Sequence, residues 1–276
     1  MKKALVKLDA KIALVMKHCM IFIALLLYSL SISAQKDSTV LHVTYKATFE
    51  KSDQSDSIAT DIERLDIGRY SSKYYSLVGD YNQRKILGLI SPNEPQYSGT
   101  ISRYEIYKNM PQKGMMEYVH SPFGITVKDS INNLFAWNLS DEDSIICEYP
   151  CKKAETAFRG RKWTVWYSID LPYNDGPWKF CGLPGLVLSA KDATGNFSFN
   201  CIGIEKGDLH PIVYNKNKRR YVTPQKAAEL REFEIKDNSA YFSYMLDGII
   251  KTIDPPEINK KKNKLRDAGG PALEIF

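Results

Sequence analysis

The sequence predicts a mainly β fold: a single curved antiparallel β-sheet or half-barrel with one short helix, following a cleaved signal peptide. Apolar and polar residues alternate with period two in many short runs, as they do in strands that bury one face. Clusters of Gly, Asn, Asp and Ser separate these runs and are typical of turns. Because residues 35–276 show no internal repeat and no linker, we expect them to form one β-rich domain.

The first 34 residues are expected to be a signal peptide. Lysines precede an uncharged run at residues 19–34, which is short for a membrane span and ends in small residues at Ser31 to Ala34. Met1 and Met16 are alternative starts, because Met16-Lys17-His18 alone supplies a compact basic region. No cysteine follows the apolar run, so we do not expect a lipoprotein anchor. The predicted location is the periplasm or the periphery of the outer membrane.

The composition and charge exclude several classes of protein. Of the 276 residues, 43% are hydrophobic and 25% are charged, which excludes a disordered or collagen-like chain. The net charge of +6 falls to +2 once residues 1–34 are removed, because they carry five Lys and one Asp. We therefore expect neither a nucleic-acid partner nor an integral membrane protein. The basic segment 260–266 is interpreted as a solvated tail, with contact to anionic lipid or polysaccharide as the alternative.

The strands and the helix follow from local patterns along the chain. Residues 41–49 alternate clearly and begin the sheet, and residues 51–60 are interpreted as a loop. The next strands are predicted at 72–78, 85–90, 101–108, 115–121, 143–149, 154–158, 163–169, 186–191 and 197–201. Thr223 as N-cap and Pro224 at the first helical position predict a helix to about residue 235. A last strand is predicted at 240–253, and residues 271–276 are apolar enough to return to a sheet edge.

Four cysteines follow the signal peptide, and an even number in an exported protein favours disulfides. They are Cys147, Cys151, Cys181 and Cys201. If the stretch from Cys147 to Cys151 were extended, their Cα atoms would lie about 13 Å apart, beyond the reach of a disulfide. We therefore expect each of these two to pair with Cys181 or Cys201, and the connectivity stays open. Free thiols and a four-cysteine zinc site are the alternatives, but the spacing lacks two CxxC pairs.

The usual catalytic signatures are absent from the sequence. It contains no GxSxG, HExxH, P-loop or GxGxxG motif, and no cofactor or metal site is predicted. His42, His120 and His210 are interpreted as surface or strand residues. The acidic group at 141–143 lacks the spacing of a calcium loop and is interpreted as a solvated turn. We therefore expect a protein that is not an enzyme.

The segment from Arg159 to Phe199 is the most distinctive part of the chain. Residues Leu183 to Leu186 fit a type II turn, in which Pro184 presets φ and Gly185 accepts a positive φ, while Gly182 adds freedom before it. Trp163, Trp166 and Trp178 supply large apolar surfaces nearby. We interpret the tryptophans as a packed core in which each indole N–H finds an acceptor. A Trp-lined ligand groove or a partner-binding face is the alternative.

Residues 158–172 and 176–187 resemble the GLPGLI family, exported proteins of Gram-negative bacteria that are named for this hexapeptide. The chain reads Gly182-Leu183-Pro184-Gly185-Leu186-Val187 and departs only at Val187, where the family has Ile. Residues 270–274 are more loosely similar to the ending of the family. The resemblance implies a periplasmic or envelope-associated β-rich protein, with no catalytic residues to carry over. The residues of the motif that could bind a ligand are Trp163, Trp166, Tyr167, Trp178, Gly182, Leu183, Pro184, Gly185, Leu186 and Val187.

These observations favour a non-catalytic envelope protein that binds a partner or ligand in outer-membrane transport or envelope maintenance. The expected partner is an outer-membrane transport or envelope protein, which would use the concave face or an edge of the sheet. One alternative is a lipid or lipoprotein carrier with an apolar cavity. Another is a hydrolase acting on peptide or glycan, for which Asp170, Asp175 and Lys179 are the candidates.

Overall fold

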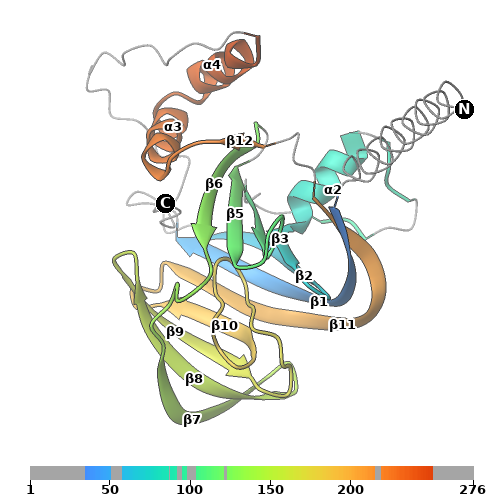
Figure 1. Ribbon diagram of the computed structural model, residues 1–276, viewed down its shortest axis with the longest axis vertical. Helices are drawn as coiled ribbons and strands as arrows, with labels where there is room; N and C mark the ends of the chain where they lie inside the picture. The colour runs from blue at the N-terminus through green and yellow to red at the C-terminus, as the bar shows by residue number, and fades with distance from the viewer. Residues whose placement is uncertain are drawn as a thin grey trace, which may run out of the picture. The chain divides into compact units, whose positions relative to one another are not determined.

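The computed structural model describes residues 35–50, 58–86, 88–91, 95–97, 104–120, 123–214 and 219–250. Twelve strands form one sheet in the order β12-β6-β5-β4-β3-β2-β1-β11-β10-β9-β8-β7 (Figure 1). The elements are β1 Gln35–Glu50, β2 Ile58–Gly68, β3 Ser72–Ser76, α2 Leu77–Ile86, β4 Tyr104–Lys108, β5 Met115–His120, β6 Ile125–Ser130, β7 Asn138–Ile146, β8 Tyr149–Phe158, β9 Arg161–Ser168, β10 Leu186–Asp192, β11 Phe197–Tyr214, β12 Arg220–Tyr221, α3 Pro224–Lys236 and α4 Asn238–Ile250.

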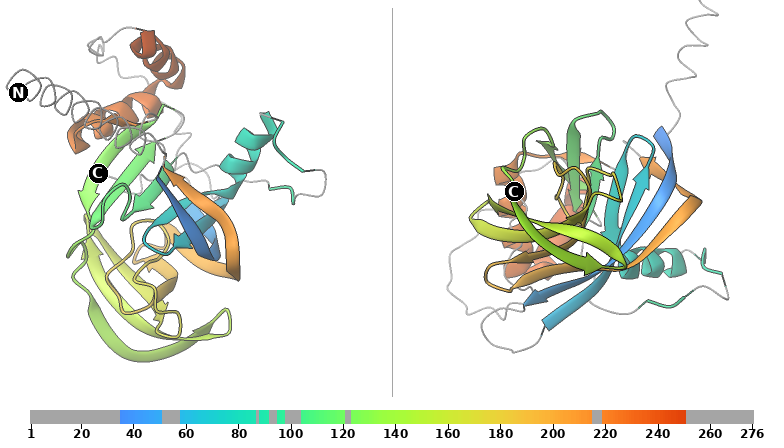
Figure 2. Two further views of the ribbon diagram at one scale, coloured as in Figure 1. Left: turned by 45° about the vertical axis from the view of Figure 1, so that its right-hand side comes forward. Right: turned by 90° about the horizontal axis from the view of Figure 1, so that it is seen from below.

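The predicted fold class is confirmed: the protein is mainly β, with one large curved sheet. The strands follow a single curved surface (Figure 2), and the end strands β12 and β7 are not neighbours, so the sheet does not close into a barrel. From β1 to β6 and from β7 to β11, each strand pairs antiparallel with the next along the chain, whereas β12 pairs with β6 in parallel. The predicted signal peptide, the basic segment 260–266 and residues 271–276 lie outside the described residues.

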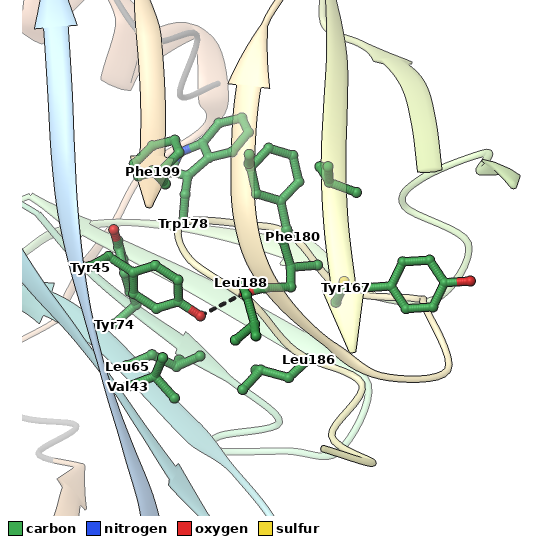
Figure 3. Close-up of a cluster of buried hydrophobic side chains, with 14 of the residues drawn as sticks. Val43, Tyr45, Leu65, Tyr74, Tyr167, Trp178, Phe180, Leu186, Leu188 and Phe199 are labelled. Carbon is green, nitrogen blue, oxygen red and sulfur yellow. Dashed lines mark hydrogen bonds between the residues drawn. The ribbon is translucent and has the colours of Figure 1, made fainter. Parts of the chain in front are cut away.

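Period-two alternation directs one side of each strand into the core. In β1, Leu41, Val43, Tyr45 and Ala47 are fully buried, as the alternation predicts. Residues from the same side of β2, β3, β9, β10 and β11 join them in one large cluster, which we call the inner-face core. Figure 3 shows part of this core, with side chains from neighbouring strands pointing toward one another.

Helix α3 is confirmed near its predicted bounds. The Thr223 side chain accepts a hydrogen bond from the backbone N–H of Lys226 at 3.2 Å, and Pro224 stands in the first turn. This satisfies one of the donors that a helix start leaves free.

Two predicted strands are wrong because the residues form helices. Residues 240–250 of the predicted strand 240–253 lie in α4, which starts where the Asp237 carboxylate accepts a hydrogen bond from Ala240 N at 2.9 Å. Its apolar Tyr241 and Met245 are four residues apart and pack in the cluster with Phe233, which is helical spacing. The predicted strand 85–90 is the second, because residues 85 and 86 end helix α2, in which Arg84 pairs with Asp80 at 2.7 Å. The predicted strand 72–78 is observed as β3 as far as Ser76, and α2 begins at Leu77.

Strands β2 and β6 were not predicted. In β2, the buried side reads Ala59, Asp61, Glu63, Leu65 and Ile67. Two carboxylates in buried positions break the apolar alternation that identifies a strand. The predicted loop 51–60 overlaps the start of β2 at residue 58, and residues 51–57 lie outside the described part.

Candidate functional site: a loop on the inner face of the sheet

Residues 169–185 connect β9 to β10 and form what we call the inner loop. The two strands are antiparallel neighbours, with Ser168 opposite Leu186, so the loop leaves and re-enters the sheet at almost the same place. Between these points it contains no helix or strand. Five of its buried side chains belong to the inner-face core, so the loop fills the curve of the sheet; they are Leu171, Trp178, Phe180, Cys181 and Leu183.

Aromatic rings join the inner loop to the sheet. The ring centroid of Phe180 lies 5.0 Å from that of Trp163, 5.3 Å from that of Trp178 and 6.3 Å from that of Phe199. The Trp163 and Trp178 rings are themselves 5.6 Å apart. These distances are typical of aromatic contacts, which add about 0.5–1.5 kcal/mol each to the burial of apolar area.

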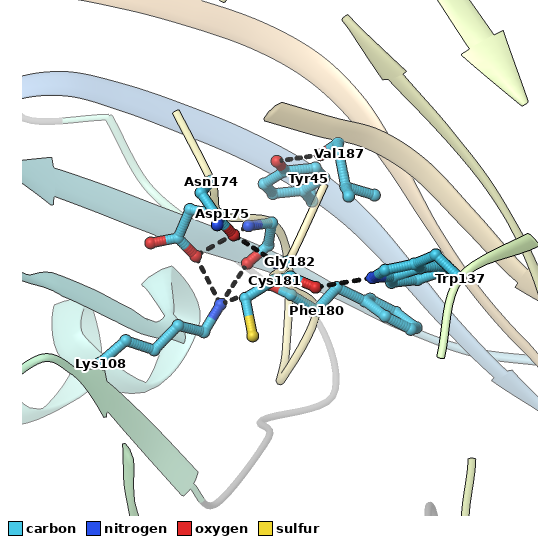
Figure 4. Close-up of polar contacts among 10 residues, drawn as sticks. Tyr45, Lys108, Trp137, Asn174, Asp175, Phe180, Cys181, Gly182 and Val187 are labelled. Carbon is cyan, nitrogen blue, oxygen red and sulfur yellow. Dashed lines mark hydrogen bonds and ion pairs between the residues drawn. The ribbon is translucent and has the colours of Figure 1, made fainter. Parts of the chain in front are cut away.

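A buried lysine anchors the loop. Lys108, at the end of β4, is 2% exposed. Its ammonium lies 2.5 Å from the Asp175 carboxylate and donates to the backbone oxygens of Gly176 and Phe180 at 2.8 and 3.0 Å (Figure 4). Three acceptors match the three N–H donors of an ammonium group. Lys108 therefore fixes residues 175–180 by charge and by hydrogen bonds together.

Two aromatic side chains of the sheet region hold the end of the loop. Trp137, just before β7, donates its indole N–H to the oxygen of Cys181 at 2.9 Å, and Tyr45 donates its hydroxyl to the oxygen of Val187 at 2.7 Å (Figure 4). These contacts bring together parts of the sequence that are 44 and 142 positions apart. Sequence spacing alone offers no signal for them.

The backbone conformation requires glycine at both Gly182 and Gly185, but at Gly185 for a different reason than predicted. Gly182 has a positive φ of 93°, in line with the freedom expected of it. Gly185 does not have a positive φ, so the predicted type II turn is wrong. A Cβ atom at Gly185 would instead lie 2.1 Å from the backbone oxygen of Ser168. The glycine is therefore required by close approach of two backbone segments.

The two motif tryptophans of the core lack the acceptors that we expected. Trp163 and Trp178 are each 1% exposed, and within the described part of the chain neither indole N–H has a hydrogen-bond partner. Both are thus packed as predicted, but each leaves a donor unsatisfied. Trp166 is only half-buried. The remaining motif side chains divide into buried Tyr167, Leu183, Leu186 and Val187 and exposed Pro184.

Lys179 is a second buried cation in the inner loop, and it is 2% exposed. Burial, with a smaller contribution from the charge of Arg159, lowers the pKa of Lys179 to about 7. Its ammonium lies 5.5 Å from the ring centroid of Tyr118 and 5.7 Å from that of Trp178. The fold therefore holds a group whose proton is bound weakly near neutral pH.

Sequence reasoning missed a group of buried polar side chains on β2 to β4. Glu63 is fully buried and accepts hydrogen bonds from the hydroxyls of Tyr74 and Tyr104, the latter at 3.1 Å. Ser76 donates to Asp61 at 3.0 Å. Burial, together with the charge of Glu63, raises the pKa of both tyrosines well above the ordinary range. The signal was the pair of acidic residues at buried positions of β2.

The residues of the hydrolase hypothesis do not form a shared cleft. Asp170 is exposed, whereas Asp175 is buried and paired with Lys108. The histidines on strands β1 and β5 are buried and paired with carboxylates: His42 with Asp66, and His120 with Glu234 at 3.4 Å. A metal-binding group of His, Cys, Asp or Glu is not found among the described residues.

Residues 141–143 were predicted as a turn, but they lie within β7 and are exposed there. Asp143 pairs with Lys152 at 2.7 Å and Glu142 with Lys153 at 2.8 Å, both on β8. These ion pairs are exposed to solvent, so each contributes little stability.

The four cysteines of the described residues are thiols in this structure. The Sγ atoms of Cys147 and Cys201 lie 3.1 Å apart, which is a contact but not a bond. The predicted disulfides are therefore not observed.

A small pocket beside helix α3 has a volume of about 10 Å³, room for about one water molecule. Its lining residues are His120, Ile125, Ala227, Leu230, Arg231, Glu234 and Tyr241. A pocket of this size is not a binding site for an organic ligand. In the described part of the chain, no helix has the length and apolar content needed to cross a membrane.

Comparison with known proteins confirms the family resemblance over the motif. Residues 160–189 match the model of a family described as "Protein of unknown function (Porph_ging)". This segment contains strand β9, the whole inner loop and strand β10 up to Ser189. A search of curated proteins finds no match.

Several solved structures are weakly similar. PNGF-II is 14% identical over 69% of this chain with a TM-score of 0.46, and this chain spans about a third (32%) of its length. A putative outer membrane lipoprotein-sorting protein domain from Vibrio parahaemolyticus is 8% identical, with 65% of this chain and 88% of that chain covered and a TM-score of 0.28. A LolA superfamily protein from Nitrosomonas europaea is 11% identical, with 63% and 88% covered and a TM-score of 0.25. Similarity at this level assigns no activity.

Proposed function

We propose that the protein is a non-catalytic envelope protein that binds an acylated amphiphile on the inner face of its sheet, in the space that the inner loop occupies. The amphiphile would be a lipid or the lipidated end of a protein, handled in outer-membrane transport or envelope maintenance. The observation that carries the proposal is the unsatisfied indole N–H group of Trp163, which lies on β9 beneath the inner loop within an otherwise apolar core.

The inner loop has the properties of a displaceable cover. It contributes no strand to the sheet. The apolar side chains with which it fills the curve of the sheet all come from the single connection between β9 and β10. Its position depends on a few polar anchors, chiefly the contacts of Lys108 with Asp175, Gly176 and Phe180. Moving the loop would leave the ladder between β9 and β10 intact.

The free energy gained by burying an acyl chain is comparable to the free energy lost when apolar side chains of the inner loop leave the core. Burying a side chain such as Leu171, Phe180 or Leu183 contributes about 1.5–3 kcal/mol, and each buried CH₂ group of a ligand contributes about 0.8 kcal/mol. An acyl chain of roughly 12–16 carbons can therefore replace the apolar contacts that several loop side chains make. A short or polar ligand cannot.

The indole N–H of Trp163 indicates which head group would be favoured. A buried donor without an acceptor costs about 1–3 kcal/mol, and this cost is removed when an acceptor arrives. The carbonyl oxygen of an acyl ester or amide supplies such an acceptor directly next to an apolar chain. An aliphatic hydrocarbon would leave the Trp163 indole group unsatisfied.

The location and the lack of catalysis are supported by separate observations. The predicted signal peptide supports export to the envelope. The candidate hydrolase residues support a non-catalytic function, because Asp170 is exposed and Asp175 is used to hold Lys108. Asp175 is thus occupied as an anchor of the loop.

The proposal is tested by titrating the purified protein with a phospholipid that carries a pyrene-labelled acyl chain. We expect saturable binding at one site, and Trp163→Phe should weaken it roughly 3- to 10-fold, the effect of losing one hydrogen bond of about 0.5–1.5 kcal/mol. The Phe ring keeps most of the packing. Thermal unfolding of the variant should change little, because the indole N–H has no partner to lose.

Trp166→Phe is the matched control, because Trp166 is half-buried and its indole N–H is not among the buried donors that lack a partner. It should bind the probe like the wild type. A folded wild-type protein that binds no probe would contradict the proposal, as would equal affinities for Trp163→Phe and the wild type. Mass spectrometry of extracted ligands distinguishes a free lipid from a lipidated peptide.

A further inference from the structure

We infer that Cys147 and Cys201 form an oxidisable pair, the site of an intrachain disulfide that joins the tip of the β7–β8 hairpin to β11. The inference concerns a different part of the molecule from the ligand site and does not depend on the proposed function. It rests on the contacts of the hairpin tip, on the backbone at Cys147 and on the surroundings of the other two cysteines.

The hairpin tip reaches β11 across the curve of the sheet. In the strand order, β10, β9 and β8 separate β11 from β7. Even so, the Sγ atom of Cys147 lies 3.1 Å from the Sγ atom of Cys201 and 3.2 Å from the backbone oxygen of Cys201. The ammonium of Lys206 on β11 lies 5.9 Å from the ring centroid of Tyr149, the first residue of β8. The tip is thus seated on β11 through side chains.

The backbone at the tip is unusual for its residues. Cys147 and Glu148 are the two residues between Ile146 and Tyr149, which are opposite each other in the ladder. Their φ angles are 49° and 68°. A two-residue hairpin link with two positive φ values favours Asn-Gly or Asp-Gly. A positive φ at a cysteine costs about 1–2 kcal/mol. In this conformation the sulfur of Cys147 lies against that of a second cysteine.

The other two cysteines have different surroundings. Cys151 is buried, and its thiol lies 3.4 Å from the backbone oxygen of Tyr149. Cys181 is buried in the inner loop, where its backbone oxygen accepts from Trp137. Among the four, which all lie in the described part of the chain, only the pair Cys147–Cys201 has a sulfur–sulfur contact. Four cysteines allow three complete pairings, and this contact selects a single bridge.

The exposure of the two thiols sets the order of the reaction. Cys147 is half-exposed, whereas Cys201 is buried, and burial raises the pKa of the Cys201 thiol. The Cys147 thiolate attacks a small-molecule disulfide, which forms a mixed disulfide and releases one small thiol. Cys201 then loses its proton and attacks the Cys147 sulfur, which releases the second small thiol. The protein pair gives up two electrons and two protons, and the small disulfide receives both.

The experiment uses the purified full chain in glutathione buffers of increasing oxidised fraction, with blocked thiols and digestion under non-reducing conditions. Trypsin with a glutamate-specific protease is required, because cleavage after Glu148 separates Cys147 from Cys151. We expect one linked peptide pair containing Cys147 and Cys201 and a mass loss of about 2 Da, the two hydrogens of the step above. The urea midpoint of the oxidised protein should exceed that of the reduced protein.

Cys151→Ser and Cys181→Ser are the matched controls and should keep the linked pair. Cys147→Ser and Cys201→Ser should each lose it while the protein stays folded by circular dichroism. A linked peptide that contains Cys151 or Cys181 in the folded wild type would overturn the inference. So would free thiols at both Cys147 and Cys201 in the folded protein after equilibration in fully oxidised glutathione.

Discussion

At the scale of single residues, burial disfavours the charged form of Lys179. Burial lowers the pKa of Lys179 from 10.5 to about 7, whereas in the unfolded chain the amine stays protonated to about pH 10. Between these values the unfolded state binds more protons, so the contribution of Lys179 to the stability rises with pH and falls as the pH drops toward 7. A buried ammonium in the inner loop therefore opposes folding at neutral pH.

We predict that Lys179→Met removes this pH dependence. The free energy of unfolding of the wild type, relative to the variant, should rise by roughly 1–2 kcal/mol between pH 7 and 8.5. Urea denaturation of both proteins at several pH values measures this difference. Comparing the two proteins cancels the titration of the buried cysteines and tyrosines, which they share. Parallel pH profiles would show that Lys179 titrates normally in the folded state.

At the scale of single elements, Gly185 holds the inner loop against the end of β9. A Cβ atom at this position would lie 2.1 Å from the Ser168 oxygen, so the backbone must shift to admit any side chain. We predict that Gly185→Ala lowers the stability by at least about 2 kcal/mol, as overpacking of a tight site does. Thermal unfolding measures the loss.

Gly203→Ala serves as the control for this substitution. Gly203 lies in β11 without a positive φ, and a Cβ atom added there would meet no other atom within 4 Å. Its replacement should change the stability by no more than about 0.5 kcal/mol. Equal effects of the two substitutions would mean that the close approach at Gly185 is not a constraint.

The elements that sequence patterns predicted are those whose buried side is purely apolar. Leu41, Val43 and Tyr45 identify β1, and Thr223 with Pro224 identifies α3. Strand β2 was missed because Asp61 and Glu63 occupy its buried side, where hydrogen bonds from other strands compensate the carboxylates. Helix α4 was predicted as a strand because, over so short a run, its apolar residues fit the two-residue period of a strand as well as the 3.6-residue period of a helix.

The site itself was predictable only in part. The motif identified the inner loop, and tryptophan content indicated a packed aromatic core. The anchors were not predictable, because Lys108 and Asp175 are 67 positions apart and neither stands in a pattern. Long-range pairs of this kind depend on the curvature of the whole sheet, which local sequence does not specify.

At the scale of the whole molecule, a curved open sheet folds around its own loop, and this arrangement makes a specific prediction for ligand binding. If an acyl chain takes the place of the inner loop, the amides of the loop should lose their partners while those of the strands keep theirs. The bonds at risk include Phe180 N to Pro177 O at 3.1 Å and Asp175 N to Tyr173 O at 2.8 Å.

Hydrogen exchange with and without a long-chain phospholipid measures this difference. We predict faster exchange across residues 169–185 in the presence of the lipid, and unchanged exchange in β9 and at the centre of β11, because local opening of the loop leaves the ladders intact. Glycerophosphocholine, which has the same head group without acyl chains, is the control and should leave the loop protected. Increased protection throughout the loop would mean that a ligand binds over the closed loop rather than in its place.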